Sequence, residues 1–306
     1  MKHFIKQGLL FLFLGVLIFS FINDRYRHSH GFRNSMDIEK YDAVPDHIEI
    51  ANVGSSHGTN SFVYDDLPLL GYNFAYASQN FHYDLLVLQQ FEEHFAPGAI
   101  LIVPVSYPSF GTTDMSRQDY IYYQFLRPGL IDHFCLEDYL KYKLFPVLTA
   151  EEKLIWLIYD EEEREPEWDS IDYNMHMDDM EEVAQKKAQD FKNVGFGDTR
   201  SILDLRELLT YIDNQGWEAM LVTTPVTWQL NQHFSASFRE EFETLISGLA
   251  EEYDVSYYDY SQDERFETQM QWFRNADHLN TKGRAYFSEI FFRESLTCQE
   301  GARDGR

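Results

Sequence analysis

From Ile48 onward, short apolar runs alternate with segments whose apolar residues recur at helical spacing. The clearest of these runs is Ala99–Val105, which follows the turn-forming pair Pro97-Gly98. Such runs are typical of strands buried on both faces, and strands that alternate with helices predict a parallel sheet covered on both sides. The sequence therefore predicts an α/β fold, and a chain of 306 residues has room for one large domain or two small ones.

The expected elements follow from this periodicity. Strands are expected at residues 48–53, 71–76, 99–105, 217–223 and 255–259. Helices are expected from about residue 59 and at residues 83–91, 199–214, 238–253 and 281–294.

The stretch from about 107 to 196 interrupts the α/β pattern. Its aromatic and apolar residues favour helices at 120–126, 136–145 and 151–159, and no strand is evident. We interpret it as a mainly helical insertion at the carboxyl edge of the sheet, suited to a lid or a substrate platform. The acidic run 160–163 lacks the alternating acids, glycine and final glutamate of a calcium loop, so a solvated helix face is the better interpretation.

An uncharged apolar run, Gly8–Ile22, follows a basic flank that contains Lys2 and Lys6. With the two apolar residues before Lys6 it approaches the roughly 20 residues that a spanning helix needs. A secretory signal peptide has the same layout, but no small-x-small cleavage site follows the run. We therefore predict an uncleaved signal anchor.

The predicted organisation has three parts. Residues 1–23 form the membrane helix, residues 24–46 a polar juxtamembrane linker, and residues 47–306 the globular domain with its insertion. We expect that domain to lie outside the cytoplasmic membrane. Three arginines soon after the apolar run argue against this orientation, because positive charge usually stays on the cytoplasmic side: Arg25, Arg27 and Arg33.

Composition excludes some partners. The chain has 51 acidic and 25 basic residues, a formal charge of −26, so nucleic acid is not an expected partner. Its two cysteines, Cys135 and Cys298, make neither a disulfide framework nor a zinc signature, and whether they pair is left open. We expect no metal and no cofactor.

Two motifs carry the chemistry. Gly54-Ser55-Ser56-His57-Gly58 follows the first expected strand, and Asp277-His278 precedes the last expected helix. A serine hydroxyl becomes a good nucleophile when a nearby base accepts its proton. In a parallel sheet both motifs would lie at the carboxyl edge, where ligands bind. The sequence therefore predicts Ser56 as nucleophile and His278 as general base, although a Gly-Ser-Ser turn alone is usually structural.

These motifs resemble those of the SGNH, or GDSL-type, hydrolase superfamily, which has a Gly-Asp-Ser block after the first strand and a late Asp-x-x-His block. Here the blocks are Gly54-Ser55-Ser56 and Asn275-Ala276-Asp277-His278. The chain looks most like the membrane-anchored branch related to the D-alanyl-transfer protein of teichoic acid synthesis and to exopolysaccharide O-acyl esterases and transferases. The resemblance covers about 48–292 without the insertion. It implies a three-layer α/β/α sandwich with a flavodoxin-like parallel sheet.

The blocks also depart from the family pattern. Asn275 stands where the family has its triad aspartate; it can orient the histidine without supplying charge, and Asp277 is the other residue considered for that role. The resemblance makes three residues of the second and third blocks candidates for oxyanion or substrate binding, with ordinary loop roles as the alternative: Ser78, Gln79 and Ser106. His57 is expected to line the pocket or to act as a second base.

The resemblance implies a serine esterase or O-acyltransferase that uses an acyl-enzyme to act on acyl esters, acetyl esters foremost, of a cell-envelope or secreted glycan. The departures leave open a second hypothesis, a weakly active or inactive scaffold in a polysaccharide or cell-wall assembly complex. The expected partners are thus a glycan or other acyl-ester substrate, the membrane through the N-terminal helix, and polysaccharide-assembly proteins.

Overall fold

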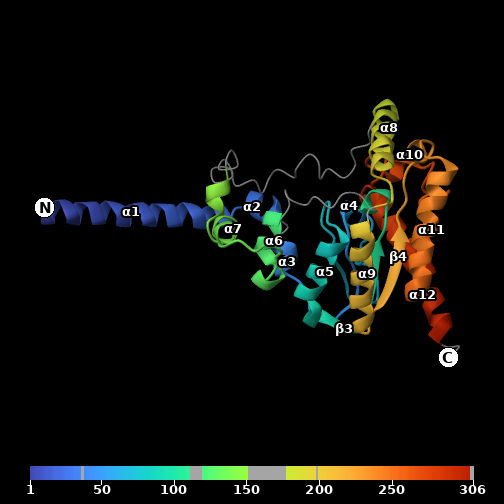
Figure 1. Cartoon of the computed structure of the whole chain (residues 1–306), viewed down its shortest axis with the longest axis horizontal. Coiled ribbons are helices and arrows are strands. Elements are labelled where there is room, and N and C mark those ends of the chain that lie inside the picture. Colours follow the sequence, from blue (N-terminus) through green and yellow to red (C-terminus); the bar gives the residue numbers. More distant parts are fainter. Residues whose placement is uncertain (36–37, 111–118, 151–176, 198, 304–306) are drawn as a thin grey trace. The chain divides into compact units, whose positions relative to one another are not determined.

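The computed structural model of the chain describes residues 1–35, 38–110, 119–150, 177–197 and 199–303 (Figure 1). The chain divides into two compact units. One comprises Met1–Val44 and Asp114–Glu167, and the other comprises Pro45–Thr113 and Trp168–Arg306.

The second unit contains a five-stranded sheet in the order β2-β1-β3-β4-β5, with every pair parallel. The strands are β1 (Ile48–Asn52), β2 (Gly71–Asn73), β3 (Phe95–Pro104), β4 (Glu218–Thr223) and β5 (Ser256–Asp259). This is the flavodoxin-like strand order, in which the direction of winding changes between β1 and β3 and leaves a crevice at the carboxyl ends of these strands. The predicted α/β class and parallel sheet are confirmed.

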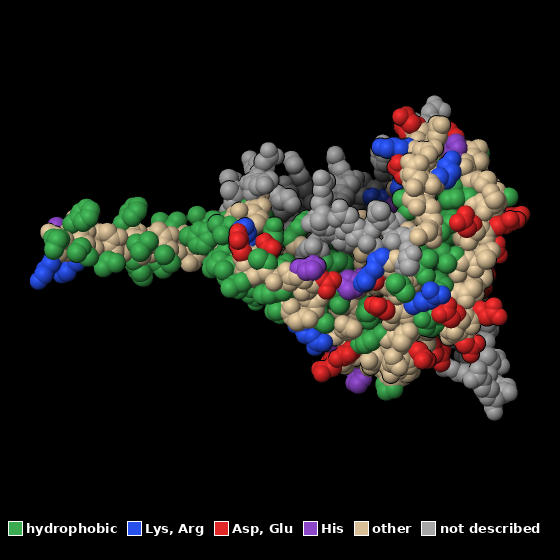
Figure 2. All heavy atoms as spheres, in the orientation of Figure 1, with side chains coloured by type: hydrophobic (Ala, Val, Ile, Leu, Met, Phe, Trp, Pro, Cys, Tyr) green, Lys and Arg blue, Asp and Glu red, His purple; other side chains and the backbone are tan. Residues whose placement is uncertain are grey.

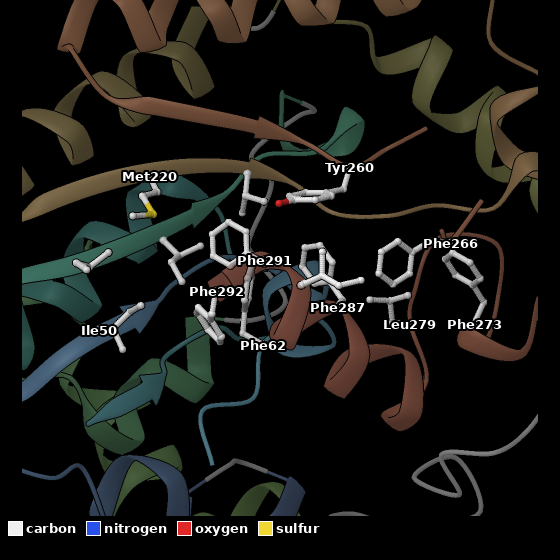
Figure 3. Packing of buried hydrophobic residues seen from close by; sticks show 14 residues of the cluster. Ile50, Phe62, Met220, Tyr260, Phe266, Phe273, Leu279, Phe287, Phe291 and Phe292 are labelled. Atoms are coloured by element: carbon white, nitrogen blue, oxygen red, sulfur yellow. The ribbon is translucent and has the colours of Figure 1, made fainter. Parts of the chain in front are cut away.

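Helices cover both faces of this sheet. Ile50, Ile102 and Val222 share one core with Phe287 and Phe291 of the last helix, α12 (Thr281–Arg303) (Figure 3). Side chains alternate between faces along each strand, so the residues between these ones point to the other face. Three further helices pack there against each other and the strands: α5 (Phe81–Gln90), α9 (Thr199–Asn214) and α11 (Ala236–Tyr253). The result is a three-layer sandwich.

The remaining helical segments of this unit are short, apart from α8 (Met177–Val194). They are α4 (Ser56–Thr59), η1 (Glu92–His94), η2 (Tyr107–Phe110), α10 (Trp228–Asn231) and η7 (Met270–Trp272). The expectation of a helix that starts near residue 59 is wrong: the helix here is the four-residue α4, which begins at Ser56, where Ser55 caps it, and ends at Thr59.

The first unit is helical. Its longest element, α1 (Lys2–Arg27), is long and apolar enough to cross a membrane. The others are α2 (His30–Ser35), α3 (Ile38–Asp42), α6 (Asp119–Phe125), η3 (Pro128–Leu130), α7 (Leu136–Asp138), a π-helical turn η4 (Tyr139–Leu144) and η5 (Pro146–Thr149). The expected helix at 151–159 and the acidic run at 160–163 lie outside the described residues.

Residues 24–46 were expected to form a spacer but are largely helical. Tyr26 and Phe32 form a small core with Ala150, and Tyr41 stacks on Phe125 with ring centroids 3.7 Å apart. Aromatic residues in this polar stretch therefore pack against the insertion. The insertion itself is divided, since 114–167 belongs to the first unit and α8 to the second.

Candidate active site

The Ser56 loop is built on close packing behind β1. Gly54 adopts a φ of +105°, which glycine tolerates best. At Gly58, a Cβ atom would lie 2.6 Å from the Val53 carbonyl oxygen and 2.7 Å from the Ala75 Cβ. Glycine at this position lets α4 lie directly against the sheet. This contact sets how far Ser56 stands from the end of β1.

Two asparagine side chains, the buried Asn52 and the half-buried Asn73, connect α4 to the sheet. The Asn52 side chain donates to the Asn73 Oδ1 at 3.1 Å and accepts from the Tyr64 hydroxyl at 2.8 Å. The Asn73 side chain in turn donates to the Gly58 carbonyl at 3.1 Å. The ends of β1 and β2 are thereby joined to the helix that carries Ser56.

The His278 loop is an Asx turn held at both ends. Asn275 Oδ1 accepts hydrogen bonds from the backbone N–H groups of Asp277 (3.1 Å) and His278 (2.9 Å). Thr227 donates its N–H and hydroxyl to the Ala276 carbonyl at 3.0 and 2.9 Å. These bonds fix the backbone from which His278 projects.

Ser56 and His278 meet although 222 positions separate them in the chain. The Ser56 hydroxyl lies 2.8 Å from Nε2 of His278. On the other side of the ring, Nδ1 is 3.1 Å from the Asn275 Oδ1 and 3.0 Å from the Asp277 Oδ1. The Asn275 oxygen can accept a hydrogen bond from Nδ1 and the Asp277 carboxylate places negative charge beside it, so both favour the tautomer with hydrogen on Nδ1 and leave Nε2 free to accept the serine proton.

Asp277 supplies the negative charge that Asn275 lacks. Its side chain is buried, and Lys187 of α8 lies 2.7 and 2.8 Å from its two oxygens. Burial alone would raise the pKa of Asp277, but the charge and hydrogen bonding of His278, followed by the charges of Lys187 and His57, outweigh burial and hold the pKa well below its usual range. Asp277 therefore stays ionised beside the imidazole.

Sequence reasoning did not single out Lys187. It lies on the face of α8 that contains the buried Met180, Ala184 and Ala188, whereas the neighbouring Lys186 is exposed. Helical projection of 177–194 would have placed a lysine at the edge of an otherwise apolar stripe. It would not have identified the carboxylate that this lysine meets.

His57 is buried beside His278, with ring centroids 4.9 Å apart. Its Nδ1 lies 3.3 Å from the Thr224 hydroxyl and its Nε2 lies 3.8 Å from Asp277. Burial, and then the neighbouring charge of His278, lower the pKa of His57 to about 3. A histidine with so low a pKa is a poor general base at neutral pH, so the role that its geometry supports is packing against the His278 ring.

Ligand atoms of His57, Asp277 and His278 lie within 4.8 Å of one another, close enough to hold a metal ion. The Lys187 ammonium, however, already lies against both oxygens of Asp277. A cation at this cluster would have to displace that ammonium, so the donor set fits an internal ion pair better than a metal site.

Two of the three oxyanion candidates are held by protein groups. The Gln79 side chain donates to Asp84 at 2.7 Å and its N–H donates to the Tyr76 carbonyl at 3.0 Å. The N–H of Ser106 donates to the Ser109 hydroxyl at 3.0 Å. Both residues therefore support loops in this structure, which is the alternative that the sequence left open.

Ser78 differs from these two residues. It is exposed and adopts a φ of +59°, in the left-handed region that costs a residue other than glycine roughly 1 kcal/mol or more. Ser56, as the first residue of α4, also has its N–H in the unpaired first turn of a helix. Ser78 thus stays a candidate for oxyanion or substrate binding, and the Ser56 N–H is a further candidate.

Besides Asp277, the site contains the buried carboxylate of Asp84, which sequence reasoning did not identify. Its Oδ1 accepts hydrogen bonds from the Gly54 N–H and the Gln79 side chain, both at 2.7 Å. Burial raises its pKa to about 7, even though these two hydrogen bonds act in the opposite direction. The sequence does contain a sign of this buried acid, because Asp84 lies on the apolar face of the helical pattern at 83–91. Asp84 ties the Ser56 loop to the loop that carries Ser78.

No family model matches the chain, and no curated protein matches it. Among solved structures, a candidate acylhydrolase from Bacteroides fragilis is similar over 86% of this chain and 94% of its own, with a TM-score of 0.41 and 8% identity. The YxiM protein of Bacillus subtilis is similar over 85% of this chain and 58% of its own, with a TM-score of 0.39 and 12% identity. These similarities are too distant to assign a family or an activity.

Proposed function

We propose that this protein is a membrane-anchored serine esterase or O-acyltransferase with Ser56 as nucleophile and His278 as general base. The observation that carries the proposal is the 2.8 Å contact between the Ser56 hydroxyl and Nε2 of His278. It is supported by the two acceptors on Nδ1, which select the reactive tautomer.

The proposed reaction has two halves. His278 Nε2 takes the hydroxyl proton as Ser56 Oγ attacks the acyl carbonyl carbon, which gives a tetrahedral intermediate. The ester C–O bond then breaks, His278 returns the proton to the leaving alcohol, and the acyl group remains on Ser56. Water or a sugar hydroxyl, deprotonated by His278, attacks this acyl-enzyme, and the serine recovers its proton.

In this proposal two residues share the role that a single aspartate has in a Ser-His-Asp triad. Asn275 sets the orientation of the His278 ring and of its backbone, while Asp277 stabilises the imidazolium that forms during each attack. Lys187 balances the buried charge of Asp277 between turnovers.

For the substrate we propose acyl esters, acetyl esters foremost, on a cell-envelope or secreted glycan outside the membrane. The anchor helix favours a substrate at or near the membrane. The formal charge of −26 favours a neutral glycan over a strongly anionic one, because like charges repel on approach.

The test compares Ser56→Ala with Ser55→Ala in hydrolysis of p-nitrophenyl acetate by the purified full chain. We expect Ser56→Ala to lower kcat by more than about 10³-fold, as loss of a nucleophile does in serine hydrolases. Ser55 caps α4, so Ser55→Ala should cost about 1 kcal/mol of stability and keep most of the activity. Unchanged activity in Ser56→Ala would show that another group is the nucleophile.

A weakly active scaffold in a polysaccharide-assembly complex is the second candidate. It is favoured by Asn275 in the acid position and by the internal hydrogen bonds of Gln79 and Ser106. A fluorophosphonate probe separates the two candidates, because it labels only an activated serine. Labelling of the native chain that disappears in Ser56→Ala supports the enzyme; a folded native chain without labelling supports the scaffold.

A further inference from the structure

The C-terminal end of α1 is joined to the insertion by a buried side chain. Asn23 directly follows the apolar run that ends at Ile22, and it is 7% exposed. Its side chain donates to the Leu144 carbonyl at 2.9 Å and accepts from the Val147 N–H at 3.4 Å. The turn at 144–147 is thus fixed at the point where the apolar part of α1 ends.

Phe145, in the middle of this turn, faces back along α1. Its ring lies against that of Phe19, with centroids 5.7 Å apart. Phe19 precedes Asn23 by four residues, which is about 6 Å along a helix. Phe145 therefore lies beside the apolar part of α1 rather than beyond its end.

Phe145 belongs to a wider set of exposed apolar side chains, which we call the 136–148 surface. Three of them recur every four residues and so lie along one side of the helical stretch from α7 to η4. The members and their exposed fractions are Leu136 (63%), Leu140 (38%), Leu144 (37%), Phe145 (37%) and Leu148 (60%). Figure 2 shows hydrophobic side chains along α1 and around its C-terminal end. Grouped apolar exposure of this kind marks an interaction surface.

We infer that the 136–148 surface lies in the interface of the same lipid bilayer that α1 spans. The inference rests on the proposed membrane anchor. Its reason is continuity: Asn23 and Phe19 place the 144–147 turn at the level where α1 leaves the hydrocarbon, so the leucines beside that turn meet acyl chains and headgroups. Removal of such side chains from water stabilises the contact through the hydrophobic effect.

The contact is apolar rather than electrostatic. Residues 128–150 contain three acids and two lysines, a net charge of −1 with histidine neutral. Lys141 pairs with Glu137 at 2.6 Å, and Lys143 bonds the Gln124 carbonyl. The surface should therefore bind zwitterionic and anionic bilayers about equally well.

Spin labels on the full chain in phosphatidylcholine nanodiscs test this inference. Labels at Leu148→Cys, Leu12→Cys and Glu39→Cys, in a background of Cys135→Ser and Cys298→Ser, are compared by their relaxation with oxygen and with a water-soluble nickel chelate. Leu12 lies in α1, and Glu39 is exposed in α3 as a solvent control. We expect the label at 148 to favour oxygen, as the label at 12 does, and to do so equally in bilayers with 30% phosphatidylglycerol.

The outcomes separate the inference from the anchor on which it rests. A label at 148 that favours the nickel chelate, while the label at 12 favours oxygen, overturns the inference and leaves the anchor intact. A label at 12 that favours the chelate removes the anchor itself. Spin–spin broadening at 148 that disappears on dilution with unlabelled chain would assign the surface to a second copy, which also overturns the inference.

Discussion

His278 Nδ1 faces two acceptors at nearly equal distances, the Asn275 amide at 3.1 Å and the Asp277 carboxylate at 3.0 Å. The residue before a histidine can reach its ring only when the backbone turns sharply. Here the Asx turn at Asn275 provides that geometry. An asparagine on one side of the ring is therefore compatible with a charged partner for the histidine.

The division of labour between these two residues can be measured. We expect Asp277→Asn to lower kcat for p-nitrophenyl acetate by about 10²–10⁴-fold, because the imidazolium loses its counter-charge. Asn275→Asp in the Asp277→Asn background should restore part of this loss, since the carboxylate is moved to the other acceptor position. Glu289→Gln, on the exposed side of α12, is the matched control. Equal activity of Asp277→Asn and the native chain would rule out a role for this charge.

Asp84 should make the free energy of unfolding decrease as the pH rises. Its pKa is about 7 in the folded chain and about 3.8 without burial, so the native state holds the proton more tightly. Stability is then full below about pH 4 and falls as pH rises to about 7, by roughly 4 kcal/mol at 1.36 kcal/mol per pKa unit.

The Asp84→Asn variant removes this titration and keeps an oxygen for the Gly54 N–H. We expect its thermal midpoint to change less between pH 4.5 and pH 7.5 than that of the native chain. Parallel pH profiles for the two proteins would show that Asp84 does not titrate in this range.

At the scale of elements, the position of Ser56 relative to the end of β1 depends on how closely α4 approaches this strand. Gly58→Ala would place a methyl 2.6 Å from the Val53 carbonyl oxygen, so α4 must shift. We expect a loss of about 1–3 kcal/mol in stability from overpacking, and about 10²-fold in kcat because small displacements of a nucleophile are costly.

Gly248→Ala is the control for this substitution. Gly248 lies inside α11 with no atom within 4 Å of its Cβ position, so alanine should raise stability by about 0.5–1 kcal/mol through helix propensity. Chemical denaturation and initial rates distinguish the two glycines. Native activity in Gly58→Ala would mean that α4 tolerates the shift.

The elements themselves were largely predictable. Buried runs such as Ala99–Val105 became central strands, and α9 has the expected bounds, from Thr199 to Asn214. The helix at residue 56 and the helices of 24–46 were missed. A four-residue helix has too little periodicity to detect, and Tyr26, Phe32 and Tyr41 are too widely spaced to mark a buried face before their partners are known.

At the scale of the whole molecule, the insertion serves both units. Its first part packs with α1–α3, where Ala150 completes a core with Tyr26 and Phe32. Its last helix, α8, contributes Lys187 to the site in the other unit. The N-terminal unit thus has a core of its own.

Truncations at two points test this division. A chain that begins at Asn23 keeps Tyr26, Phe32 and Tyr41, so we expect it to elute as a monomer in size-exclusion chromatography and to hydrolyse p-nitrophenyl acetate at the rate of the full chain. A chain that begins at Pro45 leaves Phe125 and Ala150 without these partners, so we expect it to form larger species. Indistinguishable elution of the two would mean that 23–44 adds nothing to this core.

The sequence by itself determined the α/β class, the membrane-length apolar helix and the two motifs that hold Ser56 and His278. The period of the apolar residues, the length of an apolar run and the residues of a turn are local properties. They can be recognised in a short stretch of sequence. Only the tertiary structure decided the partners of these residues. The Lys187–Asp277 pair joins positions 90 residues apart and the Gly54–Asp84 bond joins positions 30 apart. Such pairs form only when distant elements pack together, and the charged partners that packing brings to each buried carboxylate decide whether it stays ionised.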